Sequence, residues 1–155
     1  MAFRHPLHAP ADADPLSALR DLGPLEDKLG HRFSDRELLK RALTHASATA
    51  TLSNERLEFL GDRVLGLIVA ETLHARHVSE SEGALTVRFH ALVRAEACAR
   101  VAEALGLPDY IKLAGTGFDS ARAKAAILSD VCEAVIAALY LDGGMAAARA
   151  VSMRR

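Results

Sequence analysis

Three carboxylates lie within one strongly apolar stretch, Asn54-Glu55-Arg56-Leu57-Glu58-Phe59-Leu60-Gly61-Asp62. A second acidic pair, Asp130 and Glu133, lies within another apolar stretch, residues 127–141. Carboxylates among aliphatic side chains are costly to bury unless a positive group meets them. Oxygen ligands from two helices suit a divalent cation, and such a cation suits hydrolysis of a phosphodiester. The two stretches therefore indicate a helical domain with a metal site.

The composition predicts one all-α domain. The chain has 155 residues, of which 50% are hydrophobic, and it has no Trp, so Leu, Val, Ile and Ala must build the core. The net charge of −1 gives no basic field, so affinity for nucleic acid would have to come from local basic clusters and bound metal. Cys98 and Cys132 are interpreted as reduced core residues. Without a secretory signal or a membrane-spanning run, we expect a cytoplasmic protein.

Capping and breaking residues divide the chain into helices. Residues 1–15 are expected to form a flexible tail, and residues 16–155 one domain. Ser34-Asp35-Arg36-Glu37 has the spacing of a capping box, and Asn54 is placed to cap the first acidic helix. The expected helices cover residues 16–22, 25–29, 34–43, 54–76, 84–105, 121–142 and 145–153, with a surface loop over 109–120.

Helical periodicity separates the acids of the first stretch from its aliphatic side chains. At about 100° per residue, the acids share one arc, and the opposite arc is expected to face the core. The core arc holds Leu57, Leu60, Val64, Leu67 and Ile68. Phe59 and Gly66 are out of place on a merely solvated face, which suggests that another helix or a partner subunit packs there. Asp130 and Glu133 share a face through their i, i+3 spacing. If the two helices cross, the acids of both converge.

Each acid also has a structural interpretation. Glu55 stands in a first helical turn, where the helix dipole stabilises a carboxylate. Glu58 could pair with a neighbouring arginine, Asp130 and Glu133 could form one structural ion-pair site, and Glu82 could simply begin a helix. A structural role is favoured for any one of these acids alone. Their joint occurrence in two apolar helices favours the metal site.

The order and spacing of these motifs resemble those of the ribonuclease III family. Asn54 to Asp62 resembles its signature, and Leu43-Thr44-His45-Ala46-Ser47 looks like its upstream element, although His45 itself is interpreted as a helix-end or packing residue. Residues 127–144 match the closing element. The resemblance implies a dimeric, all-helical endonuclease domain that cuts double-stranded RNA with Mg²⁺, for which Mn²⁺ can substitute. The implied products carry a 5′-phosphate and a 3′-hydroxyl, and the implied role is processing of rRNA and processing or decay of mRNA.

The resemblance also implies roles for individual residues. The implied metal ligands are Glu58, Asp62, Asp130 and Glu133. The implied catalytic acids are Glu55, Asp62, Glu82, Asp130 and Glu133. Phe59 matches the aromatic residue that inserts into the partner subunit, and Lys124 matches a basic residue that precedes the second acidic helix. Arg63 departs from the family, because a small residue is common after the metal ligand.

Two other functions fit part of the pattern. A module that only binds RNA would not need the intact acidic quartet. A di-iron carboxylate bundle would use Glu-x-x-His on its helices, and Asp130 with Glu133 lacks that His. Eleven residues follow Gly144, with nothing like the family's double-stranded-RNA-binding domain. We therefore expect the endonuclease domain of a longer protein, with low sequence specificity because A-form RNA is recognised by shape.

Overall fold

The computed structural model describes residues 21–49, 51–115 and 117–153. All regular elements within them are helical, apart from one isolated parallel bridge between Thr44 and Lys112, which confirms the all-α prediction. The elements are α1 (Gly23–Leu29), α2 (Arg36–Ala42), α3 (Glu55–Arg76), α4 (Glu82–Val93), α5 (Ala95–Ala104), the 3₁₀ helix η1 (Leu107–Asp109) and α6 (Ala121–Ser152). The expected tail over residues 1–15 lies outside the described residues, as does most of the expected helix 16–22. Of the helices that are described, none is long and apolar enough to cross a membrane.

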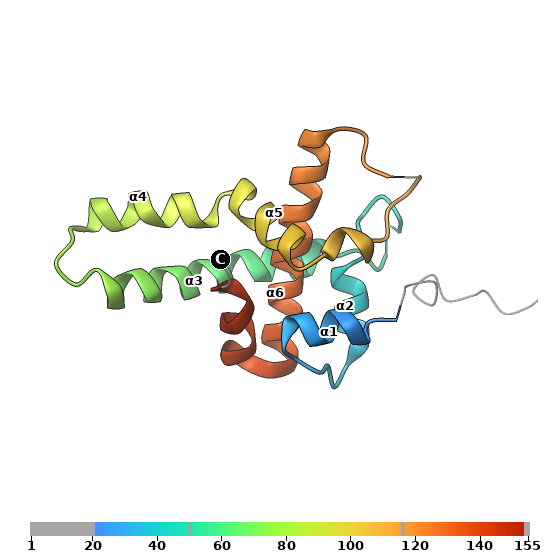
Figure 1. Cartoon of the computed structure of the whole chain (residues 1–155), viewed down its shortest axis with the longest axis horizontal. Coiled ribbons are helices and arrows are strands. Elements are labelled where there is room, and N and C mark those ends of the chain that lie inside the picture. The colour runs from blue at the N-terminus through green and yellow to red at the C-terminus, as the bar shows by residue number, and fades with distance from the viewer. Residues whose placement is uncertain (1–20, 50, 116, 154–155) are drawn as a thin grey trace, which may run out of the picture.

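Helix α6 forms the centre of the fold, and α2, α3 and α5 pack against it (Figure 1). Between residues 128 and 139, only Asp130 and Glu133 are more than 5% exposed. A helix that is apolar on nearly all sides is stable only when neighbours cover it on all sides. Helices α2, α3 and α5 supply that cover, and the contact between α3 and α6 is the most extensive of all.

Gly61 lies where α3 crosses α6. A Cβ atom at this position would lie 1.8 Å from the backbone carbonyl oxygen of Glu133, so only glycine permits this approach. The sequence argument singled out Gly66 instead, and another helix, α4, does pack there as expected, although not so closely that glycine is required. A Cβ atom at Gly66 would meet only the Phe89 ring of α4, at an ordinary contact distance of 3.5 Å. The acids of α3 and α6 therefore meet around Gly61.

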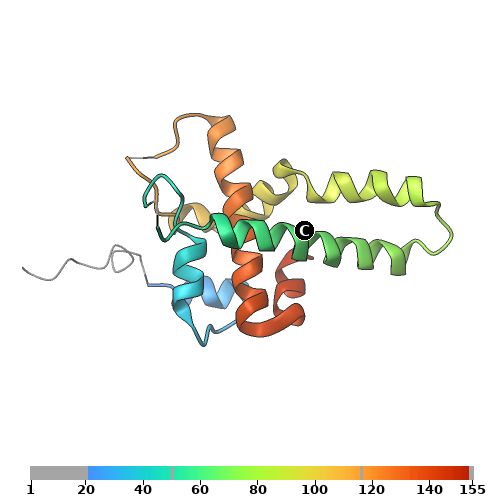
Figure 2. The same ribbon diagram turned by 180° about the vertical axis from the view of Figure 1, so that it is seen from behind.

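The second half of α3 leaves the body of the domain and pairs with α4 in a projecting hairpin, which is visible from both sides (Figures 1 and 2). The expected core position Leu67 lies on this part of α3 and is 55% exposed, so that prediction was wrong. Leu57, Val64 and Ile68 are buried as expected, and Leu60 is partly buried.

The single helix expected over residues 84–105 is in fact two. Arg94 adopts an extended conformation, with φ −64° and ψ 153°, between α4 and α5. Helix α4 packs on α3, whereas α5 turns back and buries Cys98, Ala99 and Ala102 against the body. One straight helix could not make both contacts, so the chain bends where they change.

Two buried carboxylates tie the N-terminal helices together and to α6. Glu26 of α1 is 1% exposed and accepts hydrogen bonds from Arg36 Nη2 (2.6 Å) and the Phe33 amide (3.0 Å). Burial raises the pKa of Glu26, but these hydrogen bonds outweigh it, so that the pKa is lowered overall. Asp142 of α6 accepts the Asp35 amide at 2.9 Å, next to the start of α2. These contacts hold the connection between α1 and α2 against α6, just before its kink at Gly144.

Helix ends follow local signals with some differences. Asp35, within the expected capping box, caps α2 by accepting the Glu37 amide at 3.0 Å. Asn54 takes the N-cap position of α3 as expected, but its side chain donates to the Ala42 carbonyl (3.3 Å) instead of capping. Gly144, with φ 75° and ψ −172°, kinks α6 at the expected break.

Candidate metal centre

The crossing of α3 and α6 brings four of the predicted site residues together. Glu58 and Asp62 lie one turn apart on α3, on either side of Gly61 in sequence. Glu133, whose carbonyl oxygen faces Gly61, lies one turn after Asp130 on α6. Glu58, Asp130 and Glu133 are half-buried, whereas Asp62 is exposed. The acidic quartet, Glu58, Asp62, Asp130 and Glu133, therefore surrounds the close backbone approach at Gly61.

The electrostatics confirm that these acids are neighbours. Burial and the negative charges of Cys98, Asp62, Glu58 and Asp130, in that order, raise the pKa of Glu133 from 4.5 to about 8. Burial and then the charges of Asp130, Glu55 and Asp62 raise the pKa of Glu58. The acids thus destabilise one another's charged forms, which is what closely spaced carboxylates do without a compensating cation.

Basic side chains offset little of this repulsion. Among the described residues, no lysine or arginine forms an ion pair with Glu58, Asp130 or Glu133, and Asp62 pairs only with the exposed Arg63, at 3.1 Å. The donor set consists entirely of hard carboxylate oxygens, which suit Mg²⁺. In the described part of the chain, no three His, Cys, Asp or Glu side chains are already arranged to hold an ion, so binding requires side-chain rotation.

The other predicted site residues lie at different distances from the quartet. Glu55 is exposed on the first turn of α3 and accepts a hydrogen bond from Ser53 Oγ at 2.8 Å. Glu82 begins α4 at the tip of the hairpin, which projects away from the crossing (Figures 1 and 2). Its carboxylate accepts from Thr86 Oγ1 at 2.8 Å. Within a single chain, Glu82 therefore does not lie next to the acidic quartet.

Phe59 lies on the surface of α3 between two members of the quartet. Its side chain is 63% exposed, and the Arg63 guanidinium lies over its ring at 4.0 Å from the centroid. Lys124 points its ammonium group to Glu103, at 2.9 Å, so it is engaged in an ion pair. A large exposed aromatic ring next to the acids is consistent with an uncovered interface.

The sequence argument missed Gly61. The available signal was a glycine inside a helix, three residues after Glu58 and directly before Asp62. A mid-helix glycine costs about 0.5–1 kcal/mol relative to Ala, so it calls for a packing reason. Gly66 gave the same signal, and only the tertiary structure distinguishes the two.

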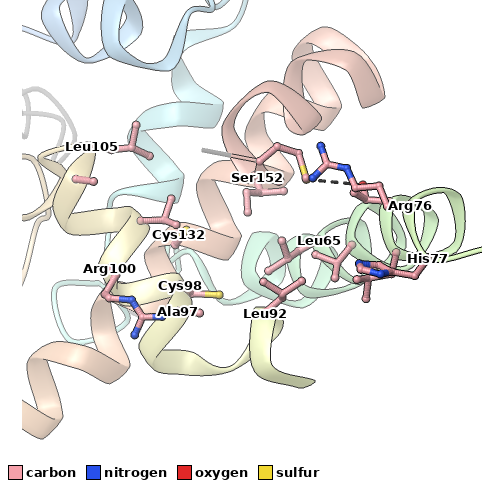
Figure 3. Close-up of a pocket in the computed structure, with 17 residues that line it drawn as sticks. Leu65, Arg76, His77, Leu92, Ala97, Cys98, Arg100, Leu105, Cys132 and Ser152 are labelled. Atoms are coloured by element: carbon pink, nitrogen blue, oxygen red, sulfur yellow. Dashed lines mark hydrogen bonds between the residues drawn. The ribbon is translucent and has the colours of Figure 1, made fainter. Parts of the chain in front are cut away.

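An apolar cavity of about 780 Å³ lies between α3, α5 and α6 (Figure 3). Leu65, Val101 and Ile136 contribute to its lining, and no Asp or Glu does. Cys98 and Cys132 also line it, and both are buried free thiols, as predicted. The cavity is thus distinct from the acidic quartet and offers no metal ligands of the carboxylate type.

The fold and the acidic crossing define a helical domain suited to divalent-cation chemistry, and comparison with known proteins supplies its family. Residues 35–155 match the family described as Ribonuclease-III-like. The chain therefore belongs to the ribonuclease-III-like family, as the sequence motifs predicted.

Relatives agree with this assignment. The chain is 50% identical over 137 residues to Ribonuclease 3 of Cereibacter sphaeroides (strain ATCC 17025 / ATH 2.4.3), which covers 86% of this chain and 60% of the relative. It is 48% identical over 145 residues to Ribonuclease 3 of Azorhizobium caulinodans, covering 90% of this chain and 62% of the relative. The chain thus spans about three fifths of the length of these relatives.

Solved structures of the ribonuclease III nuclease domain from Campylobacter jejuni are similar in fold. One has a TM-score of 0.78 at 38% identity, covering 86% of this chain and 94% of that one, and is described as flexible in a region involved in dimer formation. Another, at 2.2 Å resolution, has a TM-score of 0.77 at 37% identity and covers 88% of this chain and 93% of that one. The fold is therefore that of a ribonuclease III nuclease domain.

Proposed function

We propose that this domain is an endonuclease that hydrolyses double-stranded RNA with a divalent cation, acting as a homodimer in RNA processing. The observation that supports it best is the crossing at Gly61, which gathers four carboxylates, three of which form no ion pair with a lysine or arginine in the described part of the chain. Because the chain belongs to the ribonuclease-III-like family, hydrolysis of RNA is the reaction that we assign to this cluster. A cytoplasmic location stays a prediction.

The quartet would hold Mg²⁺, or Mn²⁺ in its place, through carboxylate oxygens from both helices. When bound, the ion would lower the pKa of a water molecule and offset charge that develops on phosphorus. Glu133 must give up its proton to act as a ligand, because its pKa is about 8 without a cation. Glu55 remains exposed at the edge of the cluster, where it can orient a water molecule or an RNA group.

The dimer is inferred from the surface of α3. Phe59 is 63% exposed and lies within the acidic signature, so a second subunit that buries it would also place two acidic clusters near each other. Because Glu82 lies at the hairpin tip of its own chain, a catalytic role for Glu82 would require the second subunit.

Substitution of Phe59 by Ala should weaken the dimer. Buried aromatic residues dominate protein interfaces, and their truncation often costs about 2–4 kcal/mol, which corresponds to a roughly 30- to 1000-fold rise in the dissociation constant. Sedimentation equilibrium measures this constant. Leu141→Ala is the matched control, because Leu141 is also an exposed apolar side chain (51% exposed) but lies on α6 and not on α3. If Phe59→Ala and the wild type had equal dimer dissociation constants, Phe59 would not contribute to the dimer interface.

The activity is tested with an end-labelled RNA duplex and its separate strands. We expect Mg²⁺-dependent cleavage of the duplex to products with 5′-phosphates, no cleavage in excess chelator, and no cleavage of the single strands. Duplex that is bound but stays intact in Mg²⁺ would favour a module that only binds RNA. Cleavage that persists in chelator would reject the metal-dependent mechanism.

A further inference from the structure

The turn that follows α2 is fixed between the segment after η1 and the start of α3. The His45 amide donates to the Lys112 carbonyl (3.0 Å), and the Lys112 amide donates to the Leu43 carbonyl (2.8 Å), which joins the turn to the segment that leads into α6. On the other side, the Asn54 amide donates to the Thr44 carbonyl (2.9 Å), directly before α3. The backbone at His45 is therefore held beside the first turn of α3.

The hydrogen bonds of the His45 ring determine which nitrogen carries the proton. The Ser47 amide donates to Nδ1 at 3.2 Å, and because a backbone amide can only donate, Nδ1 must be an acceptor. Ser47 Oγ lies 2.8 Å from the same Nδ1 and itself accepts the Ala114 amide at 3.2 Å, so its hydroxyl proton can point to the ring. A neutral ring whose Nδ1 accepts carries its proton on Nε2.

The Nε2–H group has no acceptor among the described residues and is accessible to solvent, so it is free to donate to a bound group. Burial raises the pKa of Asp130, and a positive charge on His45 would partly offset that rise, so the ring lies near this member of the acidic quartet. A lysine or arginine in this place would pair with the carboxylates and compete with a cation. A neutral imidazole donates a hydrogen bond without doing so, which suits recognition of an anionic group beside a metal site.

We propose that His45 contacts the substrate, with its Nε2–H donating a hydrogen bond to a non-bridging phosphate oxygen of the RNA strand held at the acidic quartet. The proposal rests on the proposed function, because it requires RNA at that site. Ser47 is a positioning residue in this scheme, since it fixes the proton on Nε2 and leaves Nδ1 as an acceptor.

Cleavage kinetics of two His45 variants test the contact. His45→Phe keeps a ring and loses the donor, so we expect kcat/KM for duplex cleavage to fall roughly 10- to 100-fold, as for loss of a hydrogen bond to a charged oxygen. His45→Gln can place an amide N–H near the position of Nε2, so its kcat/KM should stay within about 3-fold of wild type. The Mg²⁺ concentration for half-maximal activity should be unchanged in both variants.

The outcomes separate this proposal from the proposed function. Wild-type kcat/KM in His45→Phe overturns the contact, and so does a raised Mg²⁺ requirement in both variants, which would place His45 at the metal ligands instead. In each case the wild-type chain still cleaves RNA. Absence of cleavage by the wild type rejects the proposed function and this inference with it.

The tautomer gives a readout that does not depend on activity or on variant folding. Nitrogen-15 NMR of the wild-type histidine rings should show His45 with a proton on Nε2 and none on Nδ1. Ser47→Ala should weaken the preference without abolishing it, because the hydroxyl is lost but the backbone amide of residue 47 still donates to Nδ1. A proton on Nδ1 in the wild type would overturn the proposal, even if His45→Phe failed to fold.

Discussion

Gly61→Ala is expected to unfold the domain or to lower its free energy of unfolding by more than about 3 kcal/mol. The added Cβ would lie 1.8 Å from the Glu133 carbonyl oxygen, and neither atom can rotate away, because the helix backbones fix the positions of both. Helices α3 and α6 would have to separate along the most extensive contact in the fold. Overpacking costs about 1–3 kcal/mol where side chains can adjust, and more where they cannot. Urea denaturation measures the change.

Gly66→Ala is the matched control, because it makes the same chemical change five residues later in α3. Its Cβ would meet only the Phe89 ring, at 3.5 Å. Here the lower entropy of the unfolded chain and the better helix propensity should raise stability by about 0.5–1 kcal/mol. If both variants were as stable as the wild type, α3 and α6 could not approach as closely as the structure shows.

Glu133→Gln is expected to abolish cleavage, with a loss of about 1000-fold or more in kcat, and to leave the domain folded. The amide keeps the size of the side chain but removes the charge that a divalent cation needs, and such a cation provides several kcal/mol of transition-state stabilisation. Duplex cleavage under saturating Mg²⁺ gives the rate. Glu96→Gln, at an exposed position on α5, should cleave at the wild-type rate.

The same substitution should change how stability depends on pH. The pKa of Glu133 is raised to about 8 in the fold, so between pH 4.5 and 8 the folded chain holds a proton that the unfolded chain releases. The contribution of Glu133 to stability is therefore fully present below pH 4.5 and is lost as the pH rises to 8. Without metal, Glu133→Gln should melt at a higher temperature than the wild type above pH 8. Wild-type turnover with unchanged melting would reject the metal role of Glu133.

Local signals in the sequence predicted those parts of the site that depend on one helix. Asn54 and the polar residues after Arg76 predicted the bounds of α3, although the Asn54 side chain does not cap the helix. The i, i+3 spacing placed Asp130 and Glu133 on one face. The sequence did not predict that α3 and α6 cross; it predicted only that their acids would converge if they did. The crossing depends on Gly61, whose importance comes from a neighbour 72 positions away in the chain, Glu133.

The errors in the fold prediction have one cause, which is that helix packing in the tertiary structure cannot be inferred from local sequence patterns. Leu67 was expected in the core because we took the same face of α3 to be covered along its whole length. The second half of α3 instead projects beyond the body of the domain and packs against α4, which leaves Leu67 exposed. No glycine or proline marks Arg94, where the chain bends so that α4 can follow α3 and α5 can cover α6. Periodicity indicates which side of a helix is apolar, but it does not say which partner covers that side.

Calorimetric titration with Mn²⁺ distinguishes a metal site at the α3–α6 crossing from a structural cluster of acids. The wild-type chain should bind Mn²⁺ and release a proton at pH 7, seen as a heat that changes between buffers of different ionisation enthalpy, because Glu133 is largely protonated in the free chain. Asp62→Asn and Glu133→Gln should bind at least about 10-fold more weakly. Equal Mn²⁺ affinity in the wild type and both variants would show that the cation is held elsewhere.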